Sequence, residues 1–256
     1  MPELPEVETT KASLTPLLGQ TVHAVQVFQP KLRWPMPNDL VCLVGYSLQN
    51  VERRAKYLIL TFKQIQTLSN EEANSNESSA SRQLIMHLGM SGSLQQYPYG
   101  TEKRKHDHLI LQFSSDTFDS SNNLIDGDKN TFKDNSAITQ LHFHDPRRFG
   151  AVLWYDDYKS KLLDHLGLEP LSSEFNAYYL YKLIQRINDY DDNSNSDIID
   201  LNSNDKISKS NNFNKKKPIA RPIKSLIMEK QVVVGVGNIY AAESLYLSAI
   251  HPATPA

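Results

Sequence analysis

The spacing of apolar residues changes partway along the chain, and this change constrains the fold more than any other feature. Up to about residue 158, short segments of β-branched or alternating apolar residues are separated by turn residues, a pattern typical of a β-sandwich or barrel. The segments lie at 21–28, 48–51, 57–62, 83–88, 92–97, 108–113, 138–144 and 150–155. From Leu162 to Leu247, apolar residues recur at helical spacing instead. The sequence predicts an α+β fold, with a β-sandwich domain at 1–158 and a helical domain at 159–256.

A helix is predicted ahead of the first strand. Pro5 suits the first turn of a helix, and Glu6 and Glu8 would face the positive end of its dipole. Gly19 is the expected end of this helix. Its apolar stripe is predicted to consist of Val7, Leu14, Leu17 and Leu18.

The net charge of −2 conceals an uneven distribution of charge. Three segments rich in Asn, Ser and Asp, at 69–81, 114–136 and 188–206, lack apolar periodicity and are predicted to be solvated loop insertions. They hold 14 of the 29 acidic residues but only 3 of the 27 basic ones, so the remaining chain carries a net charge of +9. A basic remainder of this size would attract DNA, although a mild basic excess also serves solubility alone.

Membrane and export functions find no support in the sequence. No apolar run approaches the ~20 residues that span a bilayer. Met1 leads directly into Pro2 and Glu3 rather than into a basic and then apolar signal sequence, so a cytoplasmic location is expected. Cys42 is the only cysteine, which excludes an internal disulfide and a cysteine-based zinc finger, and no metal ligand is assigned.

Pro2 is the most informative residue for chemistry. Methionine before proline is normally removed, which would leave Pro2 with a free secondary amine at the mouth of a helix. The pKa of an α-amino group is about 7.7–8.0, and the helix dipole should lower it, so a useful fraction is unprotonated at neutral pH. Such an amine can attack the anomeric carbon of a sugar, with Glu3 and Glu6 as proton donors and acceptors. A proline-punctuated acidic helix cap is the plainer alternative.

Residues 2–9 read PELPEVET, which resembles the N-terminal signature of the formamidopyrimidine-DNA glycosylases. The resemblance implies that Pro2 is the nucleophile, Glu3 the main acid and base, and Glu6 its support. Arg53–Tyr57 resembles the family's RRAKY segment, which assigns Lys56 to the phosphate and the damaged site. From composition alone, these cations would be a solvated strand edge.

Two glycine-containing segments and a histidine pair extend the resemblance. His87–Ser93 reads HLGMSGS, whose methionine, Met90, enters the gap left by a flipped nucleotide in the family; a buried core methionine is the ordinary alternative. Lys105–His108 reads KHDH, and the resemblance places His106 near phosphate rather than in a metal site. In Asp145–Gly150, DPRRFG, the family's minor-groove loop, Arg147 would face the orphaned cytosine, Arg148 would hold phosphate and Phe149 would stack into the opposite strand.

The strongest match near the C-terminus is Gln231–Ala241. Read alone, its glycines resemble a dinucleotide-binding turn, but Tyr240 occupies the place of the third glycine. The family resemblance implies a helix-two-turn-helix instead, with Asn238 capping the second helix near a phosphate. A simple capped helical hairpin is the alternative.

The resemblance implies a bifunctional glycosylase and abasic-site lyase that removes oxidised purines from double-stranded DNA, acting as a monomer in the bacterial cytoplasm. Relatives that prefer oxidised pyrimidines usually have glycine in place of Leu4. The complete family protein would carry one zinc ion in a four-cysteine finger, so the chain is expected to be C-terminally truncated and to encode no cofactor site. The alternatives are a catalytically silent DNA-binding fragment and, less favoured, a nucleotide-cofactor enzyme.

Overall fold

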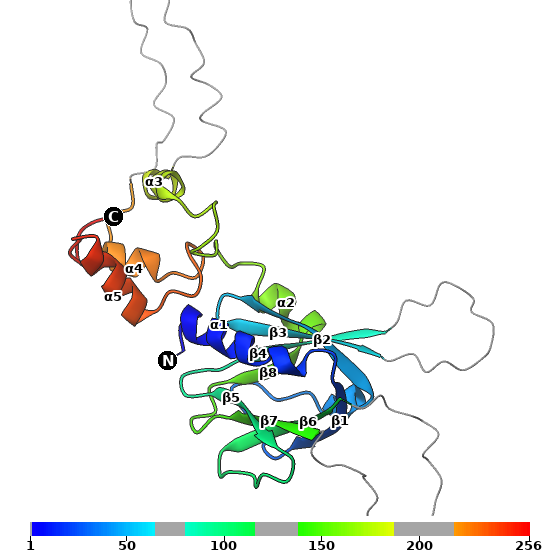
Figure 1. The fold of residues 1–256 in the computed structure, drawn as a ribbon. Coiled ribbons are helices and arrows are strands. Elements are labelled where there is room, and N and C mark those ends of the chain that lie inside the picture. The colour runs from blue at the N-terminus through cyan, green and yellow to red at the C-terminus, as the bar shows by residue number, and fades with distance from the viewer. Residues whose placement is uncertain (1, 65–79, 116–137, 187–217) are drawn as a thin grey trace, which may run out of the picture. The chain divides into compact units, whose positions relative to one another are not determined.

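The computed structural model describes residues 2–64, 80–115, 138–186 and 218–256. The chain forms two compact units, Met1–Leu166 and Gly167–Ala256 (Figure 1). The three polar segments fall almost entirely outside the described residues, so their loop character stays a prediction.

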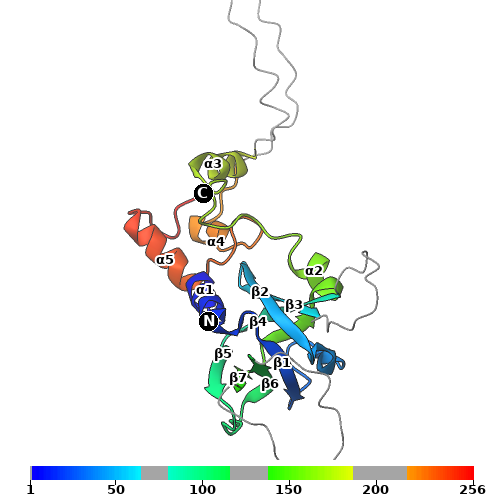
Figure 2. The same cartoon turned by 45° about the vertical axis from the view of Figure 1, so that its right-hand side comes forward.

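In the described residues of the first unit there are eight strands, one for each predicted segment. They are β1 (Thr21–Val27), β2 (Tyr46–Arg54), β3 (Tyr57–Gln64), β4 (Ser81–His87), β5 (Ser93–Pro98), β6 (Asp107–Ser114), β7 (Ile138–His144) and β8 (Ala151–Trp154). They pair in the order β5-β7-β6-β1-β2-β3-β4-β8. Within the described residues, β1 and β2 share the single pair Thr21↔Ser47, so the sheet folds there into two four-stranded layers (Figures 1 and 2). The predicted sandwich is confirmed.

The alternation of side chains along each strand explains the core. Leu58, Leu60 and Phe62 of β3 are fully buried between the layers. Ile59, which lies between them in sequence, belongs to a second apolar cluster. Because neighbouring strand residues point to opposite faces, β3 is apolar on both of its faces.

The helix α2 (Tyr155–Leu162) covers the outer face of the β2-β3-β4-β8 layer (Figure 1). Leu162 and Leu163 pack there in one cluster with Ile59 and Ile85. This packing holds α2 in the first unit, so the compact unit extends to Leu166, beyond the boundary at 158 that the sequence indicated.

The N-terminal helix α1 (Leu4–Ser13) continues into a 3₁₀ turn, η1 (Thr15–Leu17). As predicted, Val7, Leu14 and Leu17 are buried in the core. Leu18 is 41% exposed, so its assignment to the apolar stripe is wrong. The reason is local: Leu18 has an extended backbone, which turns its side chain away from the helical face.

The strand register gathers several turns at one end of the sandwich. Tyr57 pairs with His87, and His87 pairs with Ala151. The turn before β3, the loop after β4 and the loop before β8 therefore lie together.

The second layer follows the same arrangement. Asp107 pairs with His144, so β6 begins beside the end of β7, where the loop leading to β8 starts. At the far ends of the strands, Lys63 of β3 pairs with Ser81 of β4, and Ser114 of β6 pairs with Ile138 of β7.

The second unit is helical. It contains α3 (Ala177–Gln185), α4 (Ile223–Ile227) and α5 (Asn238–Leu247) around a core that includes Leu226, Val232 and Val233. The segment between α4 and α5 is held by a parallel bridge from Leu168 to Val233 and by the Tyr179 hydroxyl, which donates to the Val232 carbonyl at 2.8 Å. In the described parts of both units, no helix has the length and apolar character needed to cross a membrane.

Candidate DNA-binding and catalytic site

Glu3 and Glu6 fix the backbone beside Pro2. Glu3 is the N-cap of α1, is only 3% exposed, and forms a capping box with Glu6. Within that box, the Glu3 N–H donates to Glu6 Oε2 at 2.9 Å. Pro2 itself is half-buried. A buried carboxylate therefore stands next to an accessible proline, which is the arrangement that proton transfer around an attacking amine requires.

Lys56 occupies the two-residue turn between β2 and β3 and lies near the same carboxylates. Its neighbour Ala55 adopts a φ of +55°, as tight hairpin turns demand. Burial lowers the pKa of the Lys56 ammonium, and the charges of Glu3 and Glu6 act in the opposite direction. A cation and two carboxylates thus share one small region.

The two arginines before this turn serve the scaffold. Arg53 Nε donates to Glu8 at 2.6 Å, and Arg54 donates to the Leu166 carbonyl at 3.1 Å. Hydrogen bonds from Lys11 and Arg53 lower the pKa of Glu8. The composition-based alternative, a solvated strand edge, does not describe Arg53, whose side chain is 13% exposed. Of this basic run, Lys56 is the residue whose ammonium is influenced by the charges of Glu3 and Glu6.

Asp145 organises the loop before β8. Its side chain is fully buried and accepts the Gly150 N–H at 2.7 Å and the Ser91 hydroxyl at 3.0 Å. Its carbonyl accepts from His108 Nε2 at 2.7 Å and from the Arg148 N–H at 3.2 Å. One residue therefore fixes both ends of the loop and ties it to the neighbouring loop after β4.

The loops after β4 and before β8 are in direct backbone contact. Gly89 has a φ of +65°, and a Cβ added there would lie 2.5 Å from the Phe149 carbonyl carbon. A Cβ at Gly150 would lie 2.8 Å from the His87 carbonyl oxygen. Glycine is needed at both positions because the loops approach more closely than a side chain allows.

The side chains of these loops that the sequence predicts to contact DNA face solvent. Met90 is 43% exposed and Phe149 is 48% exposed, and Arg147 and Arg148 are exposed as well. The alternative of a buried core methionine is therefore wrong for Met90. Two apolar side chains and two cations project from a scaffold that is itself buried, an arrangement suited to inserting into a DNA groove.

Asp107 anchors the histidines of the second layer. It is buried, accepts from Arg104 Nη2 at 3.0 Å, and lies 2.9 Å from His142 Nδ1 and 2.8 Å from His144 Nδ1. Burial would raise the pKa of Asp107, but the hydrogen bonds from Arg104 and the two histidines bring it well below its usual range. The carboxylate is therefore charged at neutral pH.

His106 stands at the edge of this histidine cluster. Its ring lies edge-on to that of His144, with 5.8 Å between the centroids. Desolvation and the nearby charges of Lys105 and Arg148 lower the pKa of His106. The charge of Arg148 thus acts on His106, as expected of two residues that contact neighbouring phosphates.

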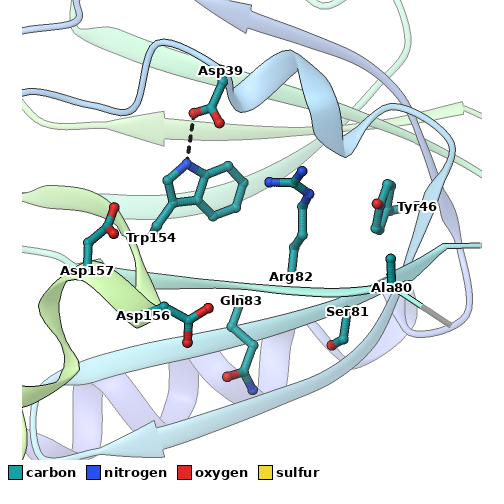
Figure 3. A pocket seen from close by; sticks show the side chains of 9 residues that line it. All are labelled: Asp39, Tyr46, Ala80, Ser81, Arg82, Gln83, Trp154, Asp156 and Asp157. Atoms are coloured by element: carbon teal, nitrogen blue, oxygen red, sulfur yellow. Dashed lines mark hydrogen bonds between the residues drawn. The ribbon is translucent and has the colours of Figure 1, made fainter. Parts of the chain in front are cut away.

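A pocket of about 460 Å³ lies elsewhere on the first unit, between β4 and the start of α2 (Figure 3). Trp154 Nε1 donates to Asp39 at 2.8 Å there, and Arg82 lies 5.5 Å from the Trp154 ring centroid. Asp156 and Asp157 also line it, so the pocket holds more carboxylates than cations. None of the residues predicted from the sequence lines this pocket, and its charge disfavours a phosphate.

Asn238 belongs to the second unit. The N-cap of α5 is Gly237, and Asn238 is the exposed first residue of the helix. The prediction that the Asn238 side chain caps this helix is therefore wrong, because the extended backbone of Gly237 is the cap and the helix starts one residue earlier than a cap at Asn238 would place it. Its contact with phosphate stays a prediction.

The described residues do not fit a structural zinc site. The chain contains one cysteine. In the parts of the chain that the structure describes, no group of three or more His, Cys, Asp or Glu side chains could hold a metal ion.

Sequence reasoning assigned no role to His87 or Asp145. The Nδ1 atom of His87 accepts a hydrogen bond from the Gly89 N–H at 2.9 Å. A signal existed for Asp145, since aspartate before proline often accepts backbone N–H groups in a turn. Nothing in the sequence indicates that either residue is buried among partners far along the chain.

Comparisons with known proteins point to a single family. The model of the formamidopyrimidine-DNA glycosylase N-terminal domain matches residues 1–152, and that of the H2TH domain of the same enzymes matches residues 201–256. The chain is 55% identical to a formamidopyrimidine-DNA glycosylase of Psychrobacter arcticus over its whole length, which spans 72% of that protein. It is 42% identical to one from Acinetobacter baylyi, of which it spans 68%.

Solved structures show the same fold. A complex of the Lactococcus lactis enzyme with DNA containing an abasic site is 25% identical, with a TM-score of 0.62 over 99% of this chain and 69% of that one. A second Lactococcus lactis complex, bound non-covalently to such DNA, is 24% identical, with a TM-score of 0.63 over 99% of this chain and 72% of that one. Sequence and fold together show that the chain belongs to the formamidopyrimidine-DNA glycosylase family.

Proposed function

We propose that the protein is a bifunctional DNA glycosylase and abasic-site lyase that excises oxidised purines, such as 8-oxoguanine and formamidopyrimidines, from double-stranded DNA. The observation that carries the proposal is the buried carboxylate of Glu3 directly after Pro2, with Lys56 nearby. The exposed Met90 and Phe149 on adjoining loops support the choice of an extruded nucleotide as substrate.

In the proposed reaction, the Pro2 nitrogen attacks C1′ of the flipped nucleotide. The bond from C1′ to the base breaks, the base leaves with the electron pair, and the proton that the Pro2 nitrogen loses passes to the base. Glu3 then protonates O4′ as the sugar ring opens, which leaves an iminium between Pro2 and C1′. Glu6 supports Glu3 through the capping box.

Strand cleavage follows from the iminium. Loss of a proton from C2′ expels the 3′ phosphate, and a second elimination expels the 5′ phosphate. Hydrolysis then releases the sugar remnant and restores the Pro2 amine. Lys56 is proposed to hold a phosphate next to the damaged nucleotide.

The exposed loops are proposed to stabilise the flipped state. Met90, Arg147 and Phe149 would fill the space left in the duplex, with Arg147 facing the orphaned cytosine. This filling offsets part of the free energy, about a few kcal/mol, that extruding a nucleotide costs. Contacts with phosphate are proposed for His106, Arg148 and Asn238.

Borohydride trapping on an 8-oxoguanine duplex tests the proposal. Intact-mass measurement first establishes that Met1 has been removed. The protein should then form a covalent adduct with the duplex after reduction, and Pro2→Gly should reduce the trapped adduct strongly, because the secondary amine that forms a permanently charged iminium is lost.

The absence of an adduct from Met1-free protein would contradict catalysis. If that protein nevertheless bound the duplex, it would be a catalytically silent DNA-binding protein. An adduct that Pro2→Gly leaves undiminished would contradict the role of Pro2.

A further inference from the structure

His87 lies where three parts of the candidate site meet. It is the last residue of β4 and pairs on one side with Tyr57, the residue after the Lys56 turn, and on the other with Ala151 at the start of β8. The His87 ring packs on the Tyr57 ring, with 5.0 Å between the centroids. A change in this side chain can therefore reach the Lys56 turn and both exposed loops.

The His87 ring carries a defined hydrogen bond. Its Nδ1 lies 2.9 Å from the Gly89 nitrogen, whose N–H donates to it. An imidazole nitrogen that accepts cannot carry a proton, so a neutral ring must bear its proton on Nε2. The hydrogen bond therefore specifies one tautomer of a neutral histidine.

Burial and two charged groups from other segments favour that neutral form. Burial is the largest cause that lowers the pKa of His87 to about 4, and the charges of Arg33 and Lys56 act in the same direction. Asp145 opposes them. At pH 7 the ring is neutral and Nδ1 is available to Gly89.

Gly89 is the point at which the two exposed loops touch. Its φ of +65° and its closeness to the Phe149 carbonyl leave this residue little freedom. Met90 follows directly, and the Ser91 hydroxyl bonds to Asp145 at 3.0 Å on the other side. The turn that presents Met90 is thus held at Gly89 by His87 and at Ser91 by Asp145.

We infer that neutral His87 is a positioning residue for lesion excision, because its Nδ1 holds the Gly89 turn that sets Met90 beside Phe149. The inference rests on the proposed function, in which Met90 fills the space of the extruded nucleotide. His87 touches no reacting atom in this account and acts through Met90.

Two substitutions separate the hydrogen bond from ring packing. His87→Asn keeps an acceptor, since an asparagine oxygen readily accepts the N–H two residues later, but it removes the ring. His87→Phe keeps a ring against Tyr57 and removes the acceptor. If the folded protein does not accommodate Phe at this position, His87→Ala takes the place of His87→Phe in the comparison, because it also lacks the acceptor.

Single-turnover assays on two duplexes give the readout. We expect His87→Phe to slow excision of 8-oxoguanine by about tenfold, the effect of losing one hydrogen bond. Cleavage at a preformed abasic site should slow by less than about twofold, because no base has to be extruded there. His87→Asn should stay within about threefold of the unmodified protein on both duplexes.

A double-substitution comparison tests the route through Met90. In a Met90→Ala background, His87→Phe should have no further effect on excision, because the side chain that it positions is gone. A loss that persists in this background, equal losses for the Asn and Phe variants, or equal slowing on both duplexes would each overturn the inference. Failure of the unmodified protein to form a borohydride adduct refutes the proposed function instead, and is seen before any variant is compared.

Discussion

The two halves of the candidate site are held in place by different means. Around Pro2, the side chains of Glu3 and Lys56 are themselves fully or partly buried, and the charges of Glu3 and Glu6 compensate that of Lys56. On the two loops, Met90 and Phe149 are exposed, and the restraints act on the backbone through Asp145 and Gly89. Groups proposed for proton transfer are thus fixed by their own contacts, whereas groups proposed to enter DNA depend on residues beneath them.

The largest effect is expected from Glu3→Gln, which keeps the shape of the buried side chain but cannot donate or accept the same proton. Excision of 8-oxoguanine should fall by about 10²- to 10⁴-fold in single-turnover measurements. Glu8→Gln is the matched control on the same helix, because Glu8 bonds to Lys11 and Arg53 and is assigned no part in the reaction. Similar losses in the two variants would contradict the assignment of Glu3.

Gly89→Ala and Gly100→Ala together test the dependence of the loops on their backbone. Both residues have positive φ, but only at Gly89 would a Cβ meet another loop, since Gly100 has nothing within 4 Å. We expect Gly100→Ala to lower the free energy of unfolding by about 1 kcal/mol, and Gly89→Ala by about 2–4 kcal/mol. Denaturant titration measures both, and equal losses would show that the loops do not press on each other.

Acid should weaken the loop region through His87. The pKa of this ring is about 4 in the folded protein, below its ordinary value of 6.5, so the unfolded chain binds more protons between these values. The stabilisation is therefore complete above about pH 6.5 and is lost as the pH falls toward 4, by up to about 3 kcal/mol.

Asp107 also weakens the fold in acid, so the measured quantity is the difference in unfolding free energy between the protein and His87→Phe. That difference should change over the pH range from 6.5 to 4. A constant difference would contradict the lowered pKa of His87.

The smallest effect on stability is expected from Met90→Ala. Because the side chain is 43% exposed, the free energy of unfolding should change by no more than about 0.5 kcal/mol. Excision from the duplex should still fall by about tenfold, as expected for a residue that acts only when DNA is bound. A loss of stability with unchanged excision would reverse the proposed distinction between the two halves.

Local patterns predicted the scaffold well. All eight strand segments were predicted because β-branched and alternating apolar residues report directly on a half-buried strand, and the buried Val7, Leu14 and Leu17 follow from helical spacing. Leu18 and the start of α5 were wrong because a single residue of extended backbone decides each of them.

The candidate site was predicted only in part. Motifs named Pro2, Glu3 and Met90, but the supporting roles of His87 and Asp145 depend on partners in other strands and loops. Burial of a polar side chain is set by tertiary structure, and neither composition nor spacing reports on it. The hydrogen bond from Arg53 to Glu8, 45 residues apart in sequence, is a further case.

The strand register also places the residues that anchor two polar connections away from the candidate site. Lys63 and Ser81 frame the connection that contains the first acidic segment, and Ser114 and Ile138 frame the second. Both pairs stand at the end of the sheet opposite to Tyr57 and His87, about 20 Å away at the usual rise per strand residue. Both connections are therefore anchored at one rim of the sheet, whereas the loops of the candidate site are anchored at the other, and the strands between them separate the two sets of anchors.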